Sequence, residues 1–448
     1  MREMKSRTSA SGFQSRQPSD NGAAEWLRPR RVGTIVGLAI LAILAAVVVP
    51  ATNAQTYTIL HRFSGPDGDD AQGLTIDRAG NLYGTTLSGG NGNCPPPIFS
   101  CGTVFRLQKR GSNWIFNTLY KFQQPSMNGF SPSSRVSIGP DGSLYGATEF
   151  GGGGPCYIYQ DGGQFHVGCG TVYRLRPSPG PCLAALCPWA ETVVHNFQGG
   201  RNDGSDPGGD LAVDSIGNIY GTTLGGGPGS CGDSGCGSVY ELTPAGGGWN
   251  KSVLYSFTGG SDGDGPYGVV IDGTGNLYGS TGDGWDLNPC GHVFQLSHSD
   301  SGWIETTVHA FTTDEGCVPG GLIFDPAGNL YGMTGARGSG GGGNVFQLAH
   351  TGSDWNLNVL YALAGEGDPL NSLARDANGN LYGVLRVGGL YGYGAVFKLS
   401  PTLSGWNFTD LHDFNVGGDG VYPFGAVVLD AQGNLYGTTA FVVWEITP

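Results

Sequence analysis

Asn81-Leu-Tyr-Gly84 opens a series of seven near-copies of one tetrapeptide. The later copies begin at Ser143, Asn218, Asn276, Asn329, Asn380 and Asn434, and the successive spacings are 62, 75, 58, 53, 51 and 54 residues. A period in this range is typical of a supersecondary unit that is repeated along a chain. The tetrapeptide therefore indicates the architecture of the protein, although it names no reaction.

Each repeat contains four short runs that fit β-strands. In the fourth copy, these runs cover residues 249–257, 269–271, 276–281 and 291–296. They are rich in β-branched and aromatic residues and are bounded by Gly, Asp or Pro, as strands usually are. No segment after residue 54 keeps a helical period of 3.6 residues. We therefore expect almost no helix in this part of the chain.

The number of repeats and the ends of the chain predict an all-β fold, a seven-bladed β-propeller of four-stranded antiparallel blades. Residues 56–63 match the fourth strand of a repeat, but no repeat precedes them. The last repeat stops at a third strand, residues 442–446. We expect strand 56–63 to complete the last blade and close the ring. An open β-solenoid is the alternative, although it would need terminal caps.

Residues 1–54 have the composition of an export signal. A basic segment ends in Arg30-Arg31, residues 32–49 carry no charge, and small residues continue to Ala54. This order is that of a signal peptide, and an uncleaved membrane anchor at residues 32–49 is the alternative. We predict two parts, 1–54 as signal peptide or anchor and 55–448 as the propeller. The protein is then exported and is secreted, periplasmic or on the cell surface.

The ten cysteines all follow residue 54 and fall into local pairs. An even number of cysteines in an exported chain predicts disulfides. Zinc binding is the alternative, but the two closest pairs lack histidines at zinc-like spacing. We predict five disulfides and no free thiol, with the pairs Cys94–Cys101, Cys156–Cys169, Cys182–Cys187, Cys231–Cys236 and Cys290–Cys317.

The charge of the chain limits the partners that it can bind. Residues 1–54 hold seven Lys/Arg and three Asp/Glu, so residues 55–448 keep 15 basic and 33 acidic side chains, a net charge of −18. A surface this acidic repels phosphate backbones. We therefore expect no nucleic acid partner. We also expect a monomer, which contacts a membrane only if the segment 32–49 is not cleaved.

Two phrases of the repeat resemble a known family. Gly73–Thr86 has the pattern Gly-Leu-x-x-Asp-x-x-Gly-Asn-Leu-Tyr-Gly-Thr-Thr, and Gly102–Leu107 has the pattern Gly-Thr-Val-Phe-x-Leu. Both resemble the GloVer tandem-repeat family of exported bacterial proteins. The turn Asp-x-x-Gly-Asn-Leu-Tyr is also weakly similar to NHL and gluconolactonase-type propeller repeats. The resemblance implies an exported repeat protein of undefined function.

Positions that break the repeat are candidates for ligand binding. Arg375 stands where the other copies have apolar residues, and Arg135 and Asp210 stand where other copies have glycine. First strands line the channel of a propeller, so these side chains could bind a ligand; an ion pair between Arg135 and Asp210 is the alternative. Asp376 should be held by its own turn, so Arg375 is the better candidate for an anionic ligand group. Trp285 is a further candidate, either for sugar stacking or as a packed loop residue.

Acidic residues in the loops that lead into first strands suggest a calcium site. Asp67 with Asp69, and Asp262 with Asp264, are carboxylates at i and i+2, and Ca²⁺ takes six to eight oxygen ligands. The alternative, which we favour, is Asp-Gly turn chemistry without an ion. Calcium is the one cofactor that the sequence suggests.

The sequence shows no Ser-His-Asp grouping, nucleophile elbow or metal-ligand cluster. Four histidines alternate with tyrosines at one strand position and are interpreted as scaffold: His61, His195, His309 and His412. We predict an extracytoplasmic binding module that engages a glycan, a peptide or a surface protein at the disulfide-bearing rim and the channel mouth. The alternative is a propeller hydrolase or lyase that acts on a sugar lactone or a polysaccharide, with calcium assistance.

Overall fold

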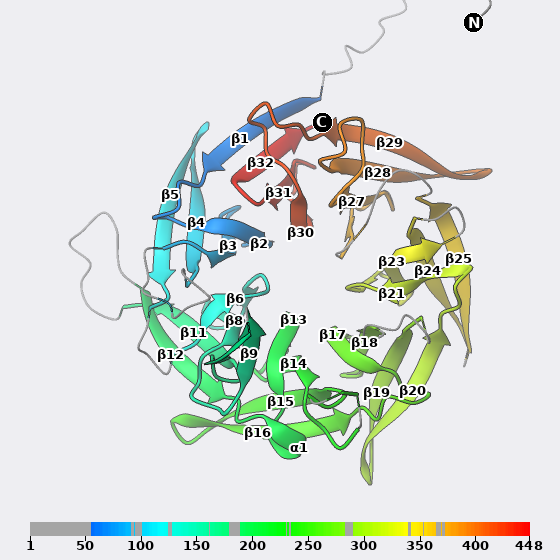
Figure 1. The fold of residues 1–448 in the computed structure, drawn as a ribbon. Helices are drawn as coiled ribbons and strands as arrows, with labels where there is room; N and C mark the ends of the chain where they lie inside the picture. The colour runs from blue at the N-terminus through cyan, green and yellow to red at the C-terminus, as the bar shows by residue number, and fades with distance from the viewer. Residues whose placement is uncertain are drawn as a thin grey trace, which may run out of the picture. The chain divides into compact units, whose positions relative to one another are not determined.

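The computed structural model describes residues 55–90, 94, 101–123, 128–160, 162–178, 189–229, 231–232, 234–282, 290–338, 342–352, 354–363, 369 and 372–448. Within these residues the chain forms seven antiparallel sheets, or blades, arranged in a ring (Figure 1). This arrangement confirms the predicted all-β, seven-bladed propeller. The predicted signal peptide or anchor, residues 1–54, lies outside the described residues.

The first three blades run outward from the ring centre in sequence order. Blade 1 consists of β2 (Asp69–Ile76), β3 (Leu82–Ser88), β4 (Thr103–Arg110) and β5 (Asn113–Lys121). Blade 2 consists of β6 (Phe130–Pro132) and β7 (Ser137–Ile138), then β8 (Leu144–Phe150), β11 (Thr171–Pro177) and β12 (Trp189–Asn196). Blade 3 consists of β13 (Ser205–Val213), β14 (Ile219–Gly225), β15 (Ser238–Ala245) and β16 (Gly248–Ser256).

Blades 4 to 6 repeat this order. Blade 4 consists of β17 (Asp264–Ile271), β18 (Leu277–Gly282), β19 (His292–Ser299) and β20 (Gly302–Ala310). Blade 5 consists of β21 (Glu315–Pro319) and β22 (Ile323–Phe324), then β23 (Leu330–Gly338), β24 (Asn344–Thr351) and β25 (Asp354–Ala362). Blade 6 consists of β26 (Ala374–Arg375), β27 (Leu381–Leu385), β28 (Ala395–Thr402) and β29 (Gly405–Asp413).

Blade 7 joins the two ends of the propeller. It consists of β30 (Pro423–Leu429), β31 (Leu435–Thr439), β32 (Val442–Thr447) and the N-terminal strand β1 (Thr56–Arg62). β1 pairs antiparallel with β32, from Thr56 opposite Thr447 to Arg62 opposite Val442. The predicted closure by residues 56–63 is therefore confirmed.

Two further elements lie in loops. A hairpin of β9 (Tyr157–Gln160) and β10 (Gly163–His166) lies between the second and third strands of blade 2. The one helix of the described residues is α1 (Gly200–Asp203), a single turn between blades 2 and 3. The expectation of almost no helix is therefore confirmed for the described part of the chain.

The turn before the repeated tetrapeptide binds the first and third residues of the tetrapeptide. Oδ1 of Asp77 accepts the backbone N–H groups of Ala79 and Asn81, at 2.9 Å each. Oδ2 accepts the side-chain amide of Asn81 and the hydroxyl of Tyr83. One carboxylate therefore binds both the turn and the start of the next strand. The same contacts recur at Asp214, Asp272, Asp325, Asp376 and Asp430.

The glycine of the tetrapeptide makes room for an aromatic ring. A Cβ atom on Gly84 would lie 2.4 Å from the ring of Phe105 on the next strand. A third-strand ring covers the equivalent glycine in every other blade: Tyr173, Tyr240, Phe294, Phe346, Phe397 and Trp444. These rings are buried, and the apolar clusters to which they belong combine residues of neighbouring blades. The tetrapeptide therefore supports the packing of blade against blade.

Candidate functional site

The inner strands of several blades line a cavity of about 500 Å³. Apolar side chains cover part of its wall, among them Ile76, Ile138, Val213 and Ile271. Polar side chains cover another part, among them Arg135, Asp210, Tyr267 and Ser372. A cavity of this size, apolar with a few convergent polar groups, is typical of a small-molecule site.

Arg135 and Asp210 form an ion pair at this cavity. Nε of Arg135, between β6 and β7, lies 2.7 Å from Oδ2 of Asp210 on β13, and 27% and 32% of the two side chains are exposed. The ion pair between blades 2 and 3, which was the alternative to ligand binding, is therefore present. The contact engages Nε and Oδ2, so the terminal guanidinium nitrogens and Oδ1 can bind a ligand. The pair thus fits both interpretations made from the sequence.

Tyr267 adds a hydrogen-bond donor beside the pair. Burial raises the pKa of Tyr267 to about 12; the negative charge of Asp210 acts in the same direction and the positive charge of Arg135 opposes it. The phenol therefore keeps its proton at neutral pH. Ser134 is 4% exposed, and its hydroxyl has no partner among the described residues. It lines a smaller adjoining cavity with Tyr267 and Asp210, so unsatisfied polar groups converge there.

Arg375 is not among the residues that line the large cavity. At the equivalent position, Phe324 packs edge-on against Tyr278 of the preceding blade, with ring centroids 5.2 Å apart. Arg375 occupies this place next to Tyr331. The pKa of Tyr331 is raised, mainly by burial, and the positive charge of Arg375 opposes this shift. Nη1 of Arg375 donates to the backbone oxygen of Asp376 at 3.5 Å, while Nε is buried with no partner among the described residues.

The structure brings Arg135 and Asp210 together at the cavity, and Arg375 is not among the residues that line this cavity. The carboxylate of Asp376 is held by its own turn, as predicted, because it accepts hydrogen bonds from Asn378, Asn380 and Tyr382. Arg375 therefore forms no ion pair among the described residues, and its role toward an anionic ligand group stays a prediction. Trp285 lies outside the described residues.

The acidic loop residues bind a ring on the strand before them. Oδ1 of Asp67 accepts the N–H and the hydroxyl of Ser64, and Oδ2 lies 2.9 Å from Nε2 of His61. Asp262 likewise accepts the N–H and hydroxyl of Thr258 and the hydroxyl of Tyr255. The same ring-to-carboxylate contact recurs in the pairs His195–Asp203, His309–Glu315 and His412–Asp419. We call these five contacts the loop clasps.

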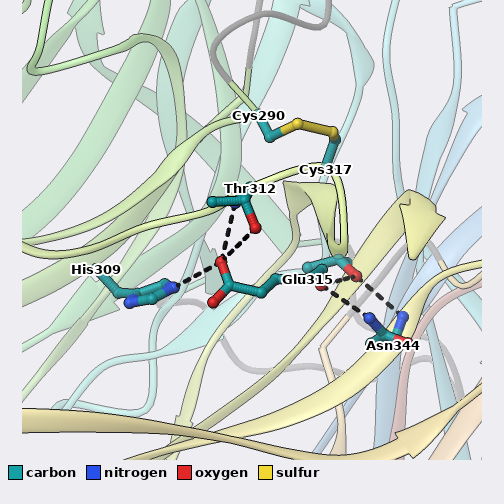
Figure 2. The surroundings of a disulfide bond; sticks show 7 residues. Cys290, His309, Thr312, Glu315, Cys317 and Asn344 are labelled. Atoms are coloured by element: carbon teal, nitrogen blue, oxygen red, sulfur yellow. Dashed lines mark hydrogen bonds and ion pairs between the residues drawn. A yellow bond between two sulfur atoms is a disulfide. The ribbon is translucent and has the colours of Figure 1, made fainter. Parts of the chain in front are cut away.

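Figure 2 shows the loop clasp that leads into blade 5. Oε2 of Glu315 accepts the N–H and hydroxyl of Thr312, at 2.9 Å each, and lies 3.3 Å from Nε2 of His309. The backbone oxygen of Glu315 accepts the side-chain amide of Asn344 at 2.9 Å. Cys317 lies two residues after Glu315 on the same strand and forms a disulfide with Cys290. This loop is therefore fixed at three points.

The clasps were missed by sequence reasoning, which treated the histidines and the acids separately. The missing signal was the spacing, since each acid follows its histidine or tyrosine by six to eight residues in the five clasps. Of the other candidate ligands, Oδ1 of Asp69 accepts the N–H of Asp70, and Asp264 begins β17. The described residues contain no group of three or more His, Cys, Asp or Glu placed to hold a metal ion. Calcium binding stays a prediction.

Asp203 is the most strongly bound of the clasp acids. Its Oδ1 lies 2.8 Å from Nε2 of His195 and 2.8 Å from Nζ of Lys251, whose side chain is 8% exposed. Burial alone would raise the pKa of Asp203, but the hydrogen bonds from His195 and Lys251 outweigh it and lower the pKa to about 2. The carboxylate therefore stays charged over the whole physiological range.

Two acids at the junction of blades 2 and 3 have the opposite tendency. Burial, and to a smaller extent the charge of Asp206, raise the pKa of Glu149 to about 7. Burial raises the pKa of Asp206 to about 6. Asp206 also has a positive φ of 56°, a conformation that L-residues rarely adopt. Its N–H donates to the carbonyl oxygen of Cys169 at 3.0 Å, so the strained residue forms a hydrogen bond between blades.

Four of the five predicted disulfides are confirmed: Cys94–Cys101, Cys156–Cys169, Cys231–Cys236 and Cys290–Cys317. The second cysteine of the first three pairs, and Cys290 of the fourth, lie where the next blade begins. Their carbonyl oxygens accept N–H groups of Ser131, Asp206, Gly265 and Val318. Cys182 and Cys187 lie outside the described residues, and their pairing stays a prediction that mass spectrometry of non-reduced peptides would test. The confirmed disulfides are typical of a protein outside the reducing cytoplasm.

Comparison with known protein families finds a match for the middle of the propeller. Residues 153–368, from the hairpin region of blade 2 through blade 5, match the Gloeobacter/Verrucomicrobia repeat. This segment is similar to that repeat family, so the predicted resemblance to the repeat is confirmed for these residues. Asp210 and Tyr267 lie within the Gloeobacter/Verrucomicrobia repeat segment, and Arg135 precedes it.

None of the curated proteins matches the chain that carries this Gloeobacter/Verrucomicrobia repeat. Among solved structures, streptogramin B lyase is 12% identical, over 88% of this chain and 97% of that one, with a TM-score of 0.53. The extracellular domain of a protein described as a hybrid two-component system from B. thetaiotaomicron is 9% identical, over 88% and 42%, with a TM-score of 0.50. A gluconolactonase from Xanthomonas campestris is 13% identical, over 88% and 90%, with a TM-score of 0.41.

The first two similarities show a shared fold and carry no activity to this chain, because one propeller architecture serves unrelated functions. In the described part of the chain, no helix has the length and apolar character needed to cross a membrane. The cavity beside Arg135 and Asp210 and the loops of the rim are therefore the parts of the molecule that bear on its function.

Proposed function

We propose that this protein is an extracytoplasmic binding module that holds a neutral sugar in the cavity beside Arg135 and Asp210. The ion pair carries the proposal, since it interrupts the repeat at two adjacent blades and both of its residues line a cavity of about 500 Å³. Among the described residues that line it, Arg135 and Asp210 are the only charged ones. Their charges cancel, which favours a ligand without net charge.

The chemistry of the wall fits a sugar. Neighbouring hydroxyl groups can donate to Oδ1 of Asp210 and accept from the terminal nitrogens of Arg135. Tyr267 offers a protonated phenol, and the apolar wall formed by residues such as Ile271 and Val213 can cover the CH face of the ring. The lining contains a carboxylate but no histidine among the described residues. This composition supports binding better than general acid–base catalysis.

Thermal-shift and calorimetric titrations with neutral sugars, uronates and short peptides would test the proposal, each with and without Ca²⁺. The double variant Arg135→Leu/Asp210→Leu keeps the net charge and removes the polar pair. We expect the full-length chain to bind at least one neutral sugar and the double variant to lose this binding more than tenfold. Both proteins should melt within a few degrees of each other, because the pair is partly exposed.

Arg375→Leu is the matched control, since leucine restores the apolar residue that the other repeats carry at this position. We expect it to keep or raise the melting temperature and to bind the sugar as the unchanged protein does. Weaker binding by this variant, with none lost in the double variant, would move the site to Arg375. Binding of peptides alone would replace the sugar by a peptide, and turnover of a lactone or polysaccharide in the same panel would favour the enzyme alternative.

A further inference from the structure

Blade 2 carries the hairpin β9–β10 in a loop where, as far as the chain is described, the other blades have none (Figure 1). Isolated two-stranded hairpins are marginally stable in water. This one is fixed at its base, because the disulfide Cys156–Cys169 flanks it and the carbonyl oxygen of Cys156 accepts the N–H of Val167 at 3.0 Å. The hairpin is therefore a rigid addition to the rim.

The two faces of the hairpin differ in exposure. Ile158 on one face packs against the buried cluster between blades 1 and 2. Tyr157 and Tyr159 on the other face are 47% and 78% exposed. Gln164 and His166, which lie opposite these tyrosines in the strand register, are exposed as well. We call these four side chains the hairpin platform.

Contacts within the platform hold its rings in place. The rings of Tyr157 and His166 meet edge to face, with centroids 5.1 Å apart. The side-chain amide of Gln164 donates to the hydroxyl of Tyr159 at 3.0 Å. Rings that are ordered before binding lose little conformational entropy when a ligand covers them. The platform is thus organised as a binding surface while remaining open to solvent.

We propose that the hairpin platform binds a neutral polysaccharide. Exposed tyrosine rings can cover the CH faces of successive sugar units, and the amide, imidazole and phenol groups can bind their hydroxyls. No Asp, Glu, Lys or Arg belongs to the platform, and the acidic propeller repels polyanions.

The size of the platform argues against a protein as its ligand. A stable protein interface needs roughly 20–30 residues on each side, whereas the platform consists of four side chains on two strands of four residues each. A polysaccharide chain needs only a few exposed rings, since each sugar unit covers a small area. This site is separate from the cavity beside Arg135 and does not depend on the function proposed for it.

Affinity electrophoresis of the full-length chain in gels that contain mixed-linkage glucan, β-1,3-glucan or mannan, together with sedimentation on cellulose and chitin, would test the proposal. We expect retention by at least one of these polymers and at least tenfold weaker retention of Tyr157→Ala/Tyr159→Ala. Tyr159→Phe should keep most of the retention, because the ring remains. Tyr391→Ala removes a tyrosine that is 54% exposed on blade 6 and should behave like the unchanged protein.

Several results would overturn the proposal. These are no retention by any of the neutral polymers, equal retention of the double tyrosine variant, or retention by alginate alone. A dimer in light scattering that the double variant abolishes would instead assign the platform to a second copy of the chain. Arg135→Leu/Asp210→Leu should keep its retention, so failure of the cavity proposal and failure of this one are distinguished in the same gels.

Discussion

The junctions from blade 1 to blade 5 and those from blade 5 back to blade 1 hold the ring together by different means. We call the first set the stapled arc, because a disulfide lies at each of its four junctions. The second set, the closing arc, has no cysteine, since none follows Cys317. In the closing arc, rings of neighbouring fourth strands stack at Tyr361–Phe408, His412–Tyr57 and His61–Phe116, with centroids 5.1, 3.9 and 3.6 Å apart.

At three of its four junctions, the stapled arc has a charged residue at the corresponding strand position. Phe408 and Phe116 lie two residues after a tryptophan, and the residues at this place in blades 2 to 4 are Glu191, Lys251 and Glu305. A stacked ring pair adds about 0.5–1.5 kcal/mol beyond its buried area, whereas a partly buried charge pair contributes little net stability. A disulfide contributes about 2–4 kcal/mol. At three of its four junctions, the stapled arc therefore has a cross-link where the fourth strands lack a stacked ring pair, and at the fourth junction Leu357 stands at this position.

Removal of β1 should lower the stability of the fold more than any other change, because it opens the closing arc. A chain that begins at residue 65 loses the strand that pairs with β32 and the stacked rings of Tyr57 and His61. It also exposes two strand edges. We expect most of the cooperative unfolding signal in circular dichroism to disappear, whereas a chain that begins at residue 55 should keep it. Equal melting of the two chains would show that closure by β1 is dispensable.

Within the stapled arc, the disulfide that joins two blades should contribute most. Cys290 and Cys317 are 27 residues apart, against 7 for Cys94 and Cys101, and the entropy that a cross-link removes from the unfolded chain grows with this separation. We expect Cys290→Ser/Cys317→Ser to lower the free energy of unfolding by about 3.5 kcal/mol and Cys94→Ser/Cys101→Ser to lower it by about 2.5 kcal/mol. Urea titrations without reductant measure both. The reverse order would mean that chain entropy does not determine how much each disulfide contributes to the free energy of unfolding.

The charged contact of the stapled arc can be broken at Asp203. Asp203→Asn leaves the buried ammonium of Lys251 without its carboxylate, which should cost about 2–3 kcal/mol at pH 7. The pKa of Asp203 is lowered, so its contribution is complete above about pH 4 and is lost as the pH falls toward 2. The variant should therefore unfold less steeply with acid than the unchanged protein. Asp203→Asn/Lys251→Met, which removes both charges, should recover most of the loss; a double variant as unstable as the single one would contradict this account.

The fold was predictable because it depends on contacts that each repeat makes with itself. The turn at Asp77 and the ring over Gly84 involve residues at most 21 positions apart, and the turn occurs in six blades and the ring in all seven. The site was less predictable, because it depends on exceptions. Arg135 and Asp210 replace a glycine of the repeat and Arg375 replaces an apolar residue, and the sequence alone does not decide which of the three line the cavity. The hairpin platform escaped notice because an insertion has no counterpart in the other repeats.

The smallest expected effect is a gain in stability from Glu149→Gln in the stapled arc. The pKa of Glu149 is about 7 in the folded protein, above its ordinary value of 4.5, because of burial and the charge of Asp206. The folded state therefore binds a proton that the unfolded chain has released, so the stabilising effect of this proton is present below about pH 4.5 and is lost as the pH rises through 7. Glutamine has no proton to lose. We expect the variant to be more stable by about 1 kcal/mol at pH 8 and equal to the unchanged protein at pH 4. Asp300→Asn, in the exposed turn between β19 and β20, is the control for the loss of one negative charge. A gain of the same size in both variants would assign the effect to overall charge, and a gain in Glu149→Gln that persists at pH 4 would show that the titration of Glu149 is not its cause.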